Sequence, residues 1–497
     1  MREFKTEKAE SAEKKDRFID FGGLRSGIPL TKQKIIWIIA AIAVSVACSF
    51  ISFEGYGDKA GIALGIIVGS IMLMLGGICS CGPAGAIFCF LTIVTGTLEL
   101  SSLTASVGAG LFFQFVGLCI VGYGIEATPF GSRLAYIMLE KFGKNPKAVV
   151  VVMLVATAML SSLISNFATL VLMSTITHRI LTEIGQKPGD SKFGAACMLG
   201  VVVGASIGGM GFIQGSIGVN MFSINAIASG TVGNFTITAG QWAVVGWITL
   251  ILLLPCVAFI YLGCIKFDSK DVQLVGTDFY RQKLKSLGSM GGSEWRWILM
   301  VVSLVVFMIK GFNTIQLMLI YTFLAVCPGI GIVSTRDAFT KAIPWEVVFS
   351  TATISMIGNV VNNNGIAKWL GDLILPVVSN VSPLIIMIVL AALAGVFINI
   401  TTGTTYAAIA IFVTCTAPVI EAIGYNPSLV LMPTIIIISF MICFYAHATV
   451  YPNYSYGYYK AGDLVLPGAL TVVVGVIISS LVCYLLAPTL WGVSLYI

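Results

Sequence analysis

Long apolar segments recur along almost the whole chain, and they constrain its fold more than any other feature. Hydrophobic residues make up 57% of the sequence and charged residues only 10%. A helix of about 20 apolar residues matches the thickness of the hydrocarbon core of a bilayer. Because lipid satisfies no backbone hydrogen bonds, such segments fold as helices. The sequence therefore predicts an all-α polytopic membrane protein.

Two of the apolar segments are too long for a single crossing, and each has a polar middle. The first, 148–181, contains the sequence Leu160–Thr169, with Ser161, Ser162, Ser165, Asn166 and Thr169. The second, 374–423, contains Thr402-Gly403-Thr404. Such groups cost several kcal/mol each in hydrocarbon unless something satisfies them. We predict two re-entrant hairpins whose polar tips hold a small solute near the midplane. The alternative is a spanning helix whose hydroxyls bond to its own carbonyls.

Counting the overlong segments as hairpins predicts about eleven transmembrane helices plus two re-entrant hairpins in an inverted repeat. The chain then divides into an N-terminal segment (1–34), a first scaffold helix (35–53) and a first repeat (54–265) with hairpin 148–181. A linker (266–296) leads to the second repeat (297–497) with hairpin 374–423.

Lysine and arginine residues indicate the orientation of this map. With a cytoplasmic N-terminus, 25 of the 28 fall on the cytoplasmic side, and only Lys59, Lys310 and Lys368 lie outside. Cytoplasmic loops of membrane proteins carry this excess of basic residues. We expect a protein of the cytoplasmic membrane, with the N-terminus and the linker inside and the C-terminus outside. The net charge of +6 thus reports topology, and no nucleic-acid partner is expected.

The two hairpins can be aligned in more than one register. Pro146 precedes the first and Pro383 the second, and matching these prolines places Ser165 opposite Thr402. A competing register matches Asn399 to Asn166. The sequence leaves both open.

A glycine-rich segment follows the first hairpin. Five glycines between Gly204 and Gly215 would cost a continuous helix several kcal/mol relative to alanine. They favour a helix that unwinds so that its carbonyls can ligate a cation; the alternative is close helix packing through small residues. A second break is predicted at Ala446–Asn453, where Pro452 removes a backbone donor. His447 lies in that segment, as a proton-sensitive group or a packing residue.

The carboxylates nearest the apolar segments lie at segment ends: Glu99, Glu126, Glu346 and Glu421. Proton-driven carriers usually keep a carboxylate within a span, and an intramembrane enzyme would need a charged catalytic group. We therefore expect no enzyme and no cofactor. Amides, hydroxyls and helix N-termini suit an anionic solute instead.

The chain resembles the divalent-anion:sodium symporter family. The resemblance rests on Phe142–Pro146, Leu160–Thr169, Ala205–Gly209 through Asn220, Ile343–Trp345, Gly365–Gly371 and Pro452-Asn453. It implies a first sodium site at Ser161, Ser165, Asn166 and a carbonyl near Gly208 or Gly209. It implies a second sodium site at Thr402, Gly403 and carbonyls near Ala448. Substrate would contact Asn166, Phe167, Gly403 and Thr404. The family also implies a homodimer with an elevator-type movement.

Two tip residues depart from the family pattern. Phe167 stands where the family has threonine, and Gly403 stands where it has an amide. We therefore expect a secondary active transporter for a small dicarboxylate or related anion, with sodium as the coupling ion. The alternative is a sodium-independent anion exchanger, ahead of an anion channel or an intramembrane enzyme.

Overall fold

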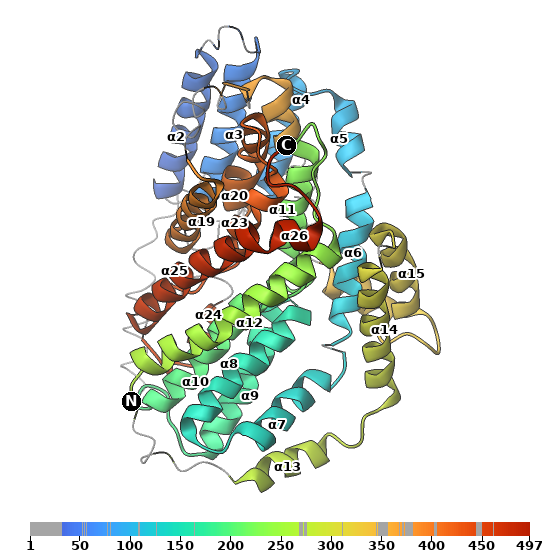
Figure 1. Ribbon diagram of the computed structural model, residues 1–497, viewed down its shortest axis with the longest axis vertical. Helices are drawn as coiled ribbons and strands as arrows, with labels where there is room; N and C mark the ends of the chain where they lie inside the picture. Colours follow the sequence, from blue (N-terminus) through green and yellow to red (C-terminus); the bar gives the residue numbers. More distant parts are fainter. Residues whose placement is uncertain are drawn as a thin grey trace, which may run out of the picture.

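The computed structural model has an all-helical architecture (Figure 1). It describes residues 32–51, 53, 55, 57–76, 78–79, 81–107, 110–125, 127–163, 165–267, 272, 276–310, 312–343, 345, 356–366, 368–369, 372, 381–401, 405–443, 450–460 and 462–497. In these residues the only β structure is an isolated bridge between Tyr425 and Tyr496. The expectation of an all-α membrane protein is confirmed.

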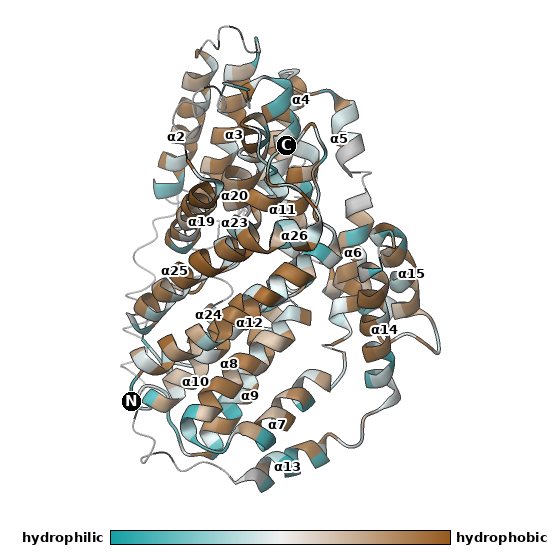
Figure 2. Ribbon diagram, in the orientation of Figure 1, coloured by the Kyte–Doolittle hydropathy of each residue, from teal (hydrophilic) through white to brown (hydrophobic). Residues whose placement is uncertain are grey.

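Five helices of the described residues are long and apolar enough to cross a membrane. They are α2 (Lys32–Ser49), α8 (Pro146–Leu163), α12 (Ala239–Cys264), α19 (Pro383–Ile400) and α25 (Gly462–Leu485). Several shorter apolar helices add to them. Large apolar side chains stay exposed on the outer faces, for example Leu299 and Val302 on α14 (Gly292–Ile309). These brown outer surfaces in Figure 2 suit contact with lipid rather than water.

The N-terminal part forms a helical bundle at one end of the molecule. It contains α2, α3 (Ala60–Leu75) and α4 (Cys81–Val94), and α2 packs along α3. α5 (Leu100–Val107) and α6 (Gly110–Tyr123) follow it.

The first hairpin and the helices after it form the centre of the fold. α8 and α9 (Asn166–Glu183) pack on α10 (Lys192–Gly208), and α8 and α10 make the most extensive helix pair of the molecule. α11 (Ile217–Gly230) follows the unwound residues 209–216, and α12 crosses the molecule beside α25 (Figure 1). α12 starts with a capping box in which Thr238 and Gln241 satisfy each other's backbone N–H groups.

The predicted linker contains the amphipathic helix α13 (Thr277–Ser286), which packs on α7 (Phe130–Phe142). Arg133 on α7 makes a buried bidentate ion pair with Glu294 at the start of α14, with Nε–Oε1 at 2.9 Å and Nη2–Oε2 at 3.1 Å. Its Nη1 also donates to the Gly288 carbonyl, at 2.9 Å. These bonds fix the linker against α7. α15 (Thr314–Val326), α16 (Thr335–Asp337) and the π-helical turn η2 (Ala338–Ala342) follow α14.

The helices of the second half are more irregular. α19 begins at Pro383 and α8 at Pro146, and both are 18 residues long. The return arm of the second hairpin is divided into α20 (Thr405–Ile409), the π-turn η3 (Ala410–Thr414) and α21 (Ala417–Ala422). α22 (Pro427–Val430), α23 (Met432–Ile438), α24 (Tyr451–Tyr454), α25 and α26 (Ala487–Trp491) complete the chain.

The second helix break lies earlier than the sequence indicated. The helix ends at Ile438, and residues 440–443 are already non-helical, although 429–448 reads as one apolar span. Pro452 lies in the first turn of α24, where its missing N–H costs nothing. Of the predicted break Ala446–Asn453, residues 446–449 lie outside the described residues.

Candidate functional site

The tip of the first hairpin is a sharp turn between two helices. Ser165 adopts an extended conformation (φ −62°, ψ 143°), and its hydroxyl accepts a hydrogen bond from the Ala168 N–H at 3.2 Å. This is the geometry of an N-cap. The backbone N–H of Asn166 donates to an acceptor outside its own helix, the Gly215 carbonyl, at 3.1 Å. One continuous spanning helix, the alternative that the sequence left open, is therefore excluded.

Three oxygens converge on the Asn166 side chain in the orientation that satisfies its hydrogen bonds. Its amide nitrogen donates to the Gly215 carbonyl at 2.7 Å, to the Ser161 hydroxyl at 2.8 Å and to the Ala205 carbonyl at 3.2 Å. Ser161 in turn donates to the Ala205 carbonyl at 2.5 Å and is fully buried. Ser162 instead bonds within its own helix, to Met159. Ser161 and Asn166 thus join the hairpin to α10 and to the unwound segment.

The glycines of this region divide into two groups with different roles. Gly200, Gly204 and Gly208 share the face of α10 that packs on α8, where a Cβ at Gly204 would lie 2.5 Å from the Leu154 carbonyl oxygen. They provide close helix packing. Gly209 and Gly215 lie at the hairpin tip, where a Cβ on Gly209 would strike the Asn166 amide. The helix is thus unwound at Gly209 and Gly215 and closely packed at Gly200, Gly204 and Gly208.

Asn399 binds the second unwound segment. It is buried near the end of α19, and its nitrogen donates to the carbonyls of Gly395 and Phe440, both at 2.9 Å. Its oxygen accepts from the N–H groups of Ile442 at 3.1 Å and Cys443 at 3.0 Å. One amide thus satisfies three backbone groups of the second unwound segment. An asparagine from each hairpin binds the helix break that follows it.

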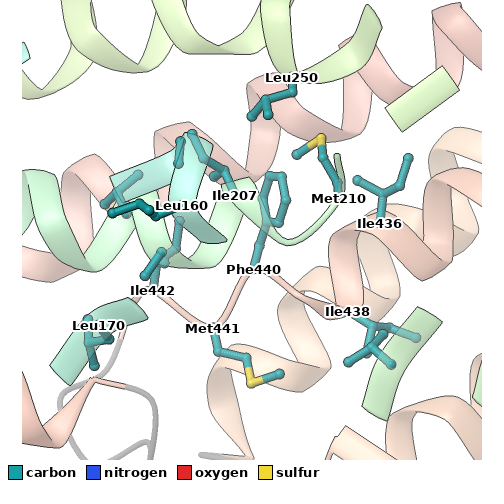
Figure 3. Close-up of a cluster of buried hydrophobic side chains, with 14 of the residues drawn as sticks. Leu160, Leu170, Ile207, Met210, Leu250, Ile436, Ile438, Phe440, Met441 and Ile442 are labelled. Atoms are coloured by element: carbon teal, nitrogen blue, oxygen red, sulfur yellow. The ribbon is translucent and has the colours of Figure 1, made fainter. Parts of the chain in front are cut away.

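The two unwound segments meet in the middle of the molecule. Ser216, at the end of the first, and Ser439, at the start of the second, are joined by their hydroxyls at 3.3 Å. Figure 3 shows the surrounding apolar cluster, in which Met210 and Phe440 lie close together and Leu160 and Ile207 flank them. Polar backbone from both halves is therefore enclosed by apolar side chains, which raises the strength of any electrostatic interaction there.

Two further asparagines contribute to this region without having been singled out as site residues. Asn220 is fully buried, and its nitrogen donates to the Gly209 carbonyl at 3.0 Å and to the Ile213 carbonyl at 3.2 Å. Asn453 is also fully buried and donates to Ser174 on α9 at 2.6 Å. The oxygens of both amides have no hydrogen-bond partner among the described residues. The signal in the sequence that could have identified them was an amide side chain within an apolar segment, because a buried polar group needs hydrogen-bond partners.

The structure brings six of the predicted site residues together: Ser161, Ser165, Asn166, Phe167, Gly208 and Gly209. Thr402, Gly403, Thr404, His447 and Ala448 lie outside the described residues. Phe167 lies at the hairpin tip and is 50% exposed. The described residues hold no group of three or more His, Cys, Asp or Glu that could bind a metal ion.

The chemistry of this site is that of neutral oxygen ligands and helix ends. Hydroxyl and carbonyl oxygens converge near Ser161, as a hard cation requires, although without a carboxylate. The N-terminus of α9, at the tip, presents backbone N–H groups and a positive dipole end, which favour an anion. The same turn can therefore serve a small cation on one side and an anion on the other.

This architecture is shared with solved membrane transporters. The chain is similar to MtrF of Neisseria gonorrhoeae, described as one of a class of antimetabolite efflux pumps, with a TM-score of 0.56, 10% identity and coverage of 91% of this chain and 94% of that one. It is also similar to the YdaH transporter of Alcanivorax borkumensis, with a TM-score of 0.51, 11% identity and coverage of 93% and 99%. At these identities the likeness shows the fold alone, which is all-helical.

The family is defined by sequence. Residues 32–496 match the sodium:sulfate symporter transmembrane region, and the chain belongs to this family of transporters. It is 26% identical over 367 residues to the sodium-dependent dicarboxylate transporter SdcS of Staphylococcus saprophyticus, which covers 68% of each chain. SdcS of Staphylococcus aureus is 24% identical over 362 residues, again 68% of each chain. The resemblance inferred from the hairpin motifs is confirmed, and the protein is a transporter rather than an enzyme.

Proposed function

We propose that this protein is a secondary active transporter that carries a small dicarboxylate or related anion across the cytoplasmic membrane together with sodium. The observation that carries the proposal is the meeting of the two helix breaks at Ser216 and Ser439, each bound by an asparagine of its own hairpin. Backbone groups released from helices at the centre of a membrane protein are typical of substrate and ion sites in secondary carriers. The sodium-dependent dicarboxylate transporters among its relatives support the choice of ion and substrate.

We propose that both hairpins are re-entrant and that the chain is an inverted repeat with about eleven transmembrane helices. The equal lengths of α8 and α19, each starting with proline, support the repeat. The excess of lysine and arginine on one side of the predicted map supports a cytoplasmic N-terminus and an external C-terminus. In this proposal the hairpins move against a scaffold, elevator-like, in a homodimer.

The first sodium ion would be held by Ser161, Ser165, Asn166 and a carbonyl of Gly208 or Gly209. The substrate would bind beside it at Asn166 and Phe167, facing Gly403 and Thr404 of the second tip, where Thr402 and Ala448 would complete a second sodium site. Sodium and the anion then neutralise one another in a region of low dielectric, so each stabilises the binding of the other. This coupling is the physical basis of symport.

The test is uptake of labelled succinate into proteoliposomes that contain the purified protein, with an inward sodium gradient and with choline replacing sodium. We expect uptake only with sodium. Ser161→Ala should abolish it, because this hydroxyl bonds across to the Ala205 carbonyl at the proposed ion site. Ser162→Ala is the matched control, since Ser162 is equally buried but bonds only to its own helix.

Equal uptake by the two serine variants would contradict the proposed ion site. Full uptake in choline would contradict sodium coupling, and uptake that also required a counter-anion inside the vesicles would support the exchanger.

A further inference from the structure

A cavity of about 320 Å³ opens between α7, α9 and α13, away from the hairpin tip. Two basic side chains line it, Arg179 from α9 and Lys283 from α13. Hydroxyls from all three helices line it as well, contributed by Ser132, Thr175 and Ser286. Ile176 belongs to its apolar wall. The volume falls at the small end of the range for ligand sites.

Among the described residues, no carboxylate lines this cavity. The nearby Glu140 and Asp278 both pair with Arg281, at 3.1 and 3.2 Å. Glu294 pairs with Arg133. Among the described residues, Arg179 has neither an ion pair nor a hydrogen bond, and the ammonium of Lys283 lies 5.2 Å from the ring of Phe279.

The electrostatic environment of Tyr136 shows that the charge of Arg179 reaches the cavity. Burial raises the pKa of the Tyr136 phenol, while the positive charge of Arg179 acts in the opposite direction. Tyr136 is only 6% exposed and lines the same cavity. Arg179 is itself exposed, and it lines the cavity while its charge acts on the buried phenol of Tyr136.

We infer that this cavity is a binding site for a phosphate-bearing anion, separate from the proposed transport site. Arg and Lys donors with several hydroxyls match the oxygens of a phosphate group, which arginine binds through its planar fork of donors. The apolar wall suits a phosphate that is attached to a less polar group. Arg179 is 13 residues along α9 from Asn166, or roughly 20 Å at 1.5 Å per residue.

The phosphate could come from a lipid headgroup or from a soluble anion, and α13 makes both accessible. This amphipathic helix buries Tyr280 on one face and exposes Arg281 and Lys285 on the other. Helices of this kind lie at the surface of membranes and attract anionic lipids. A bound phosphate would bridge α9, an arm of the first hairpin, to the linker helix α13.

The experiment measures thermal stability of the purified full-length protein, because a ligand that binds the folded state raises its melting temperature. One arm titrates inorganic phosphate into detergent-solubilised protein. The other compares nanodiscs of phosphatidylcholine with nanodiscs that contain phosphatidylglycerol. We expect stabilisation in at least one arm. Arg179→Gln and Lys283→Gln should each raise the ligand concentration needed for a given stabilisation about tenfold, as expected for one lost charge-assisted bond.

Lys285→Gln is the matched control in the phosphate arm, since it removes the same charge from the same helix outside the cavity. Its response to phosphate should equal that of the wild type. Stabilisation by phosphatidylglycerol alone would identify a lipid headgroup, and stabilisation by phosphate alone a soluble ligand; both support the site. Equal responses in all four proteins, or no stabilisation in either arm, would overturn it. Neither arm depends on transport, so failure here leaves the proposed function intact.

Discussion

Removing the Asn399 side chain should destabilise the second helix break. Asn399→Ala leaves three backbone groups of residues 440–443 without their partner: the Phe440 carbonyl and the N–H groups of Ile442 and Cys443. Phe440 and Ile442 are fully buried and Cys443 is 7% exposed, so water cannot replace the amide easily. Each buried group that loses its partner costs about 1–3 kcal/mol. The loss of three should therefore cost at least about 3 kcal/mol.

Asn364→Ala is the matched control. Asn364 is buried to a similar degree, but its nitrogen donates only to the carbonyls of Thr97 and Val360. The Val360 carbonyl keeps its backbone bond to the Asn364 N–H, so the truncation leaves one group unpaired and should cost about 1–3 kcal/mol.

Both variants would be compared with the wild type in denaturant unfolding in detergent, and in labelled succinate uptake. Asn399→Ala should unfold at clearly lower denaturant than Asn364→Ala and should lose uptake, which Asn364→Ala retains. If the two variants have the same unfolding midpoint, the assignment of Asn399 as the residue that satisfies the second break is refuted.

Two further predictions concern the first hairpin. Gly208→Ala should lower the unfolding midpoint, because its Cβ would strike the Ala158 carbonyl and lie 2.8 Å from the Ser161 Cβ; overpacking of this kind costs about 1–3 kcal/mol. Gly200→Ala is the control, since its Cβ meets nothing closer than 3.3 Å and the variant should be tolerated. Equal unfolding midpoints for the two variants would contradict close packing at Gly208. Phe167→Thr should raise uptake of succinate relative to anions with an apolar body, since the half-exposed ring at the tip offers apolar area and no donor. Val171→Thr, one turn further on α9 and 40% exposed, should leave that preference unchanged, and a similar shift in both variants would contradict a substrate contact at Phe167.

The hairpin turn and the first break were predictable because their signals are local. A cluster of hydroxyls and an amide within an apolar run has to find partners, and Ser165 forms the helix cap that such a residue favours. Five glycines in twelve residues predict an unwound helix for the same local reason.

The features of the site and fold that the sequence did not predict depend on contacts between distant residues, which no local pattern contains. Ser216 and Ser439 are 223 residues apart in sequence, and Asn399 reaches Cys443 across 44 residues. The second break was misplaced because residues 440–443 are apolar, and only the amide of Asn399 makes their unwound backbone stable. The buried pair of Arg133 and Glu294 was not predicted either, since both residues read as ordinary charges of cytoplasmic segments.

Asn166 offers the sharpest test of whether a cation binds at the first tip. Three oxygens, from Ser161, Ala205 and Gly215, lie within 3.2 Å of its amide nitrogen. Asn166→Asp replaces that donor with a carboxylate oxygen, which those three oxygens repel unless a cation lies between them. The variant should therefore melt well below the wild type in choline and recover in sodium, by a larger shift than the wild type shows. Asn364→Asp, whose nitrogen also donates to carbonyls, should be destabilised without recovery in sodium. Recovery of both variants, or of neither, would contradict a sodium site formed by these oxygens.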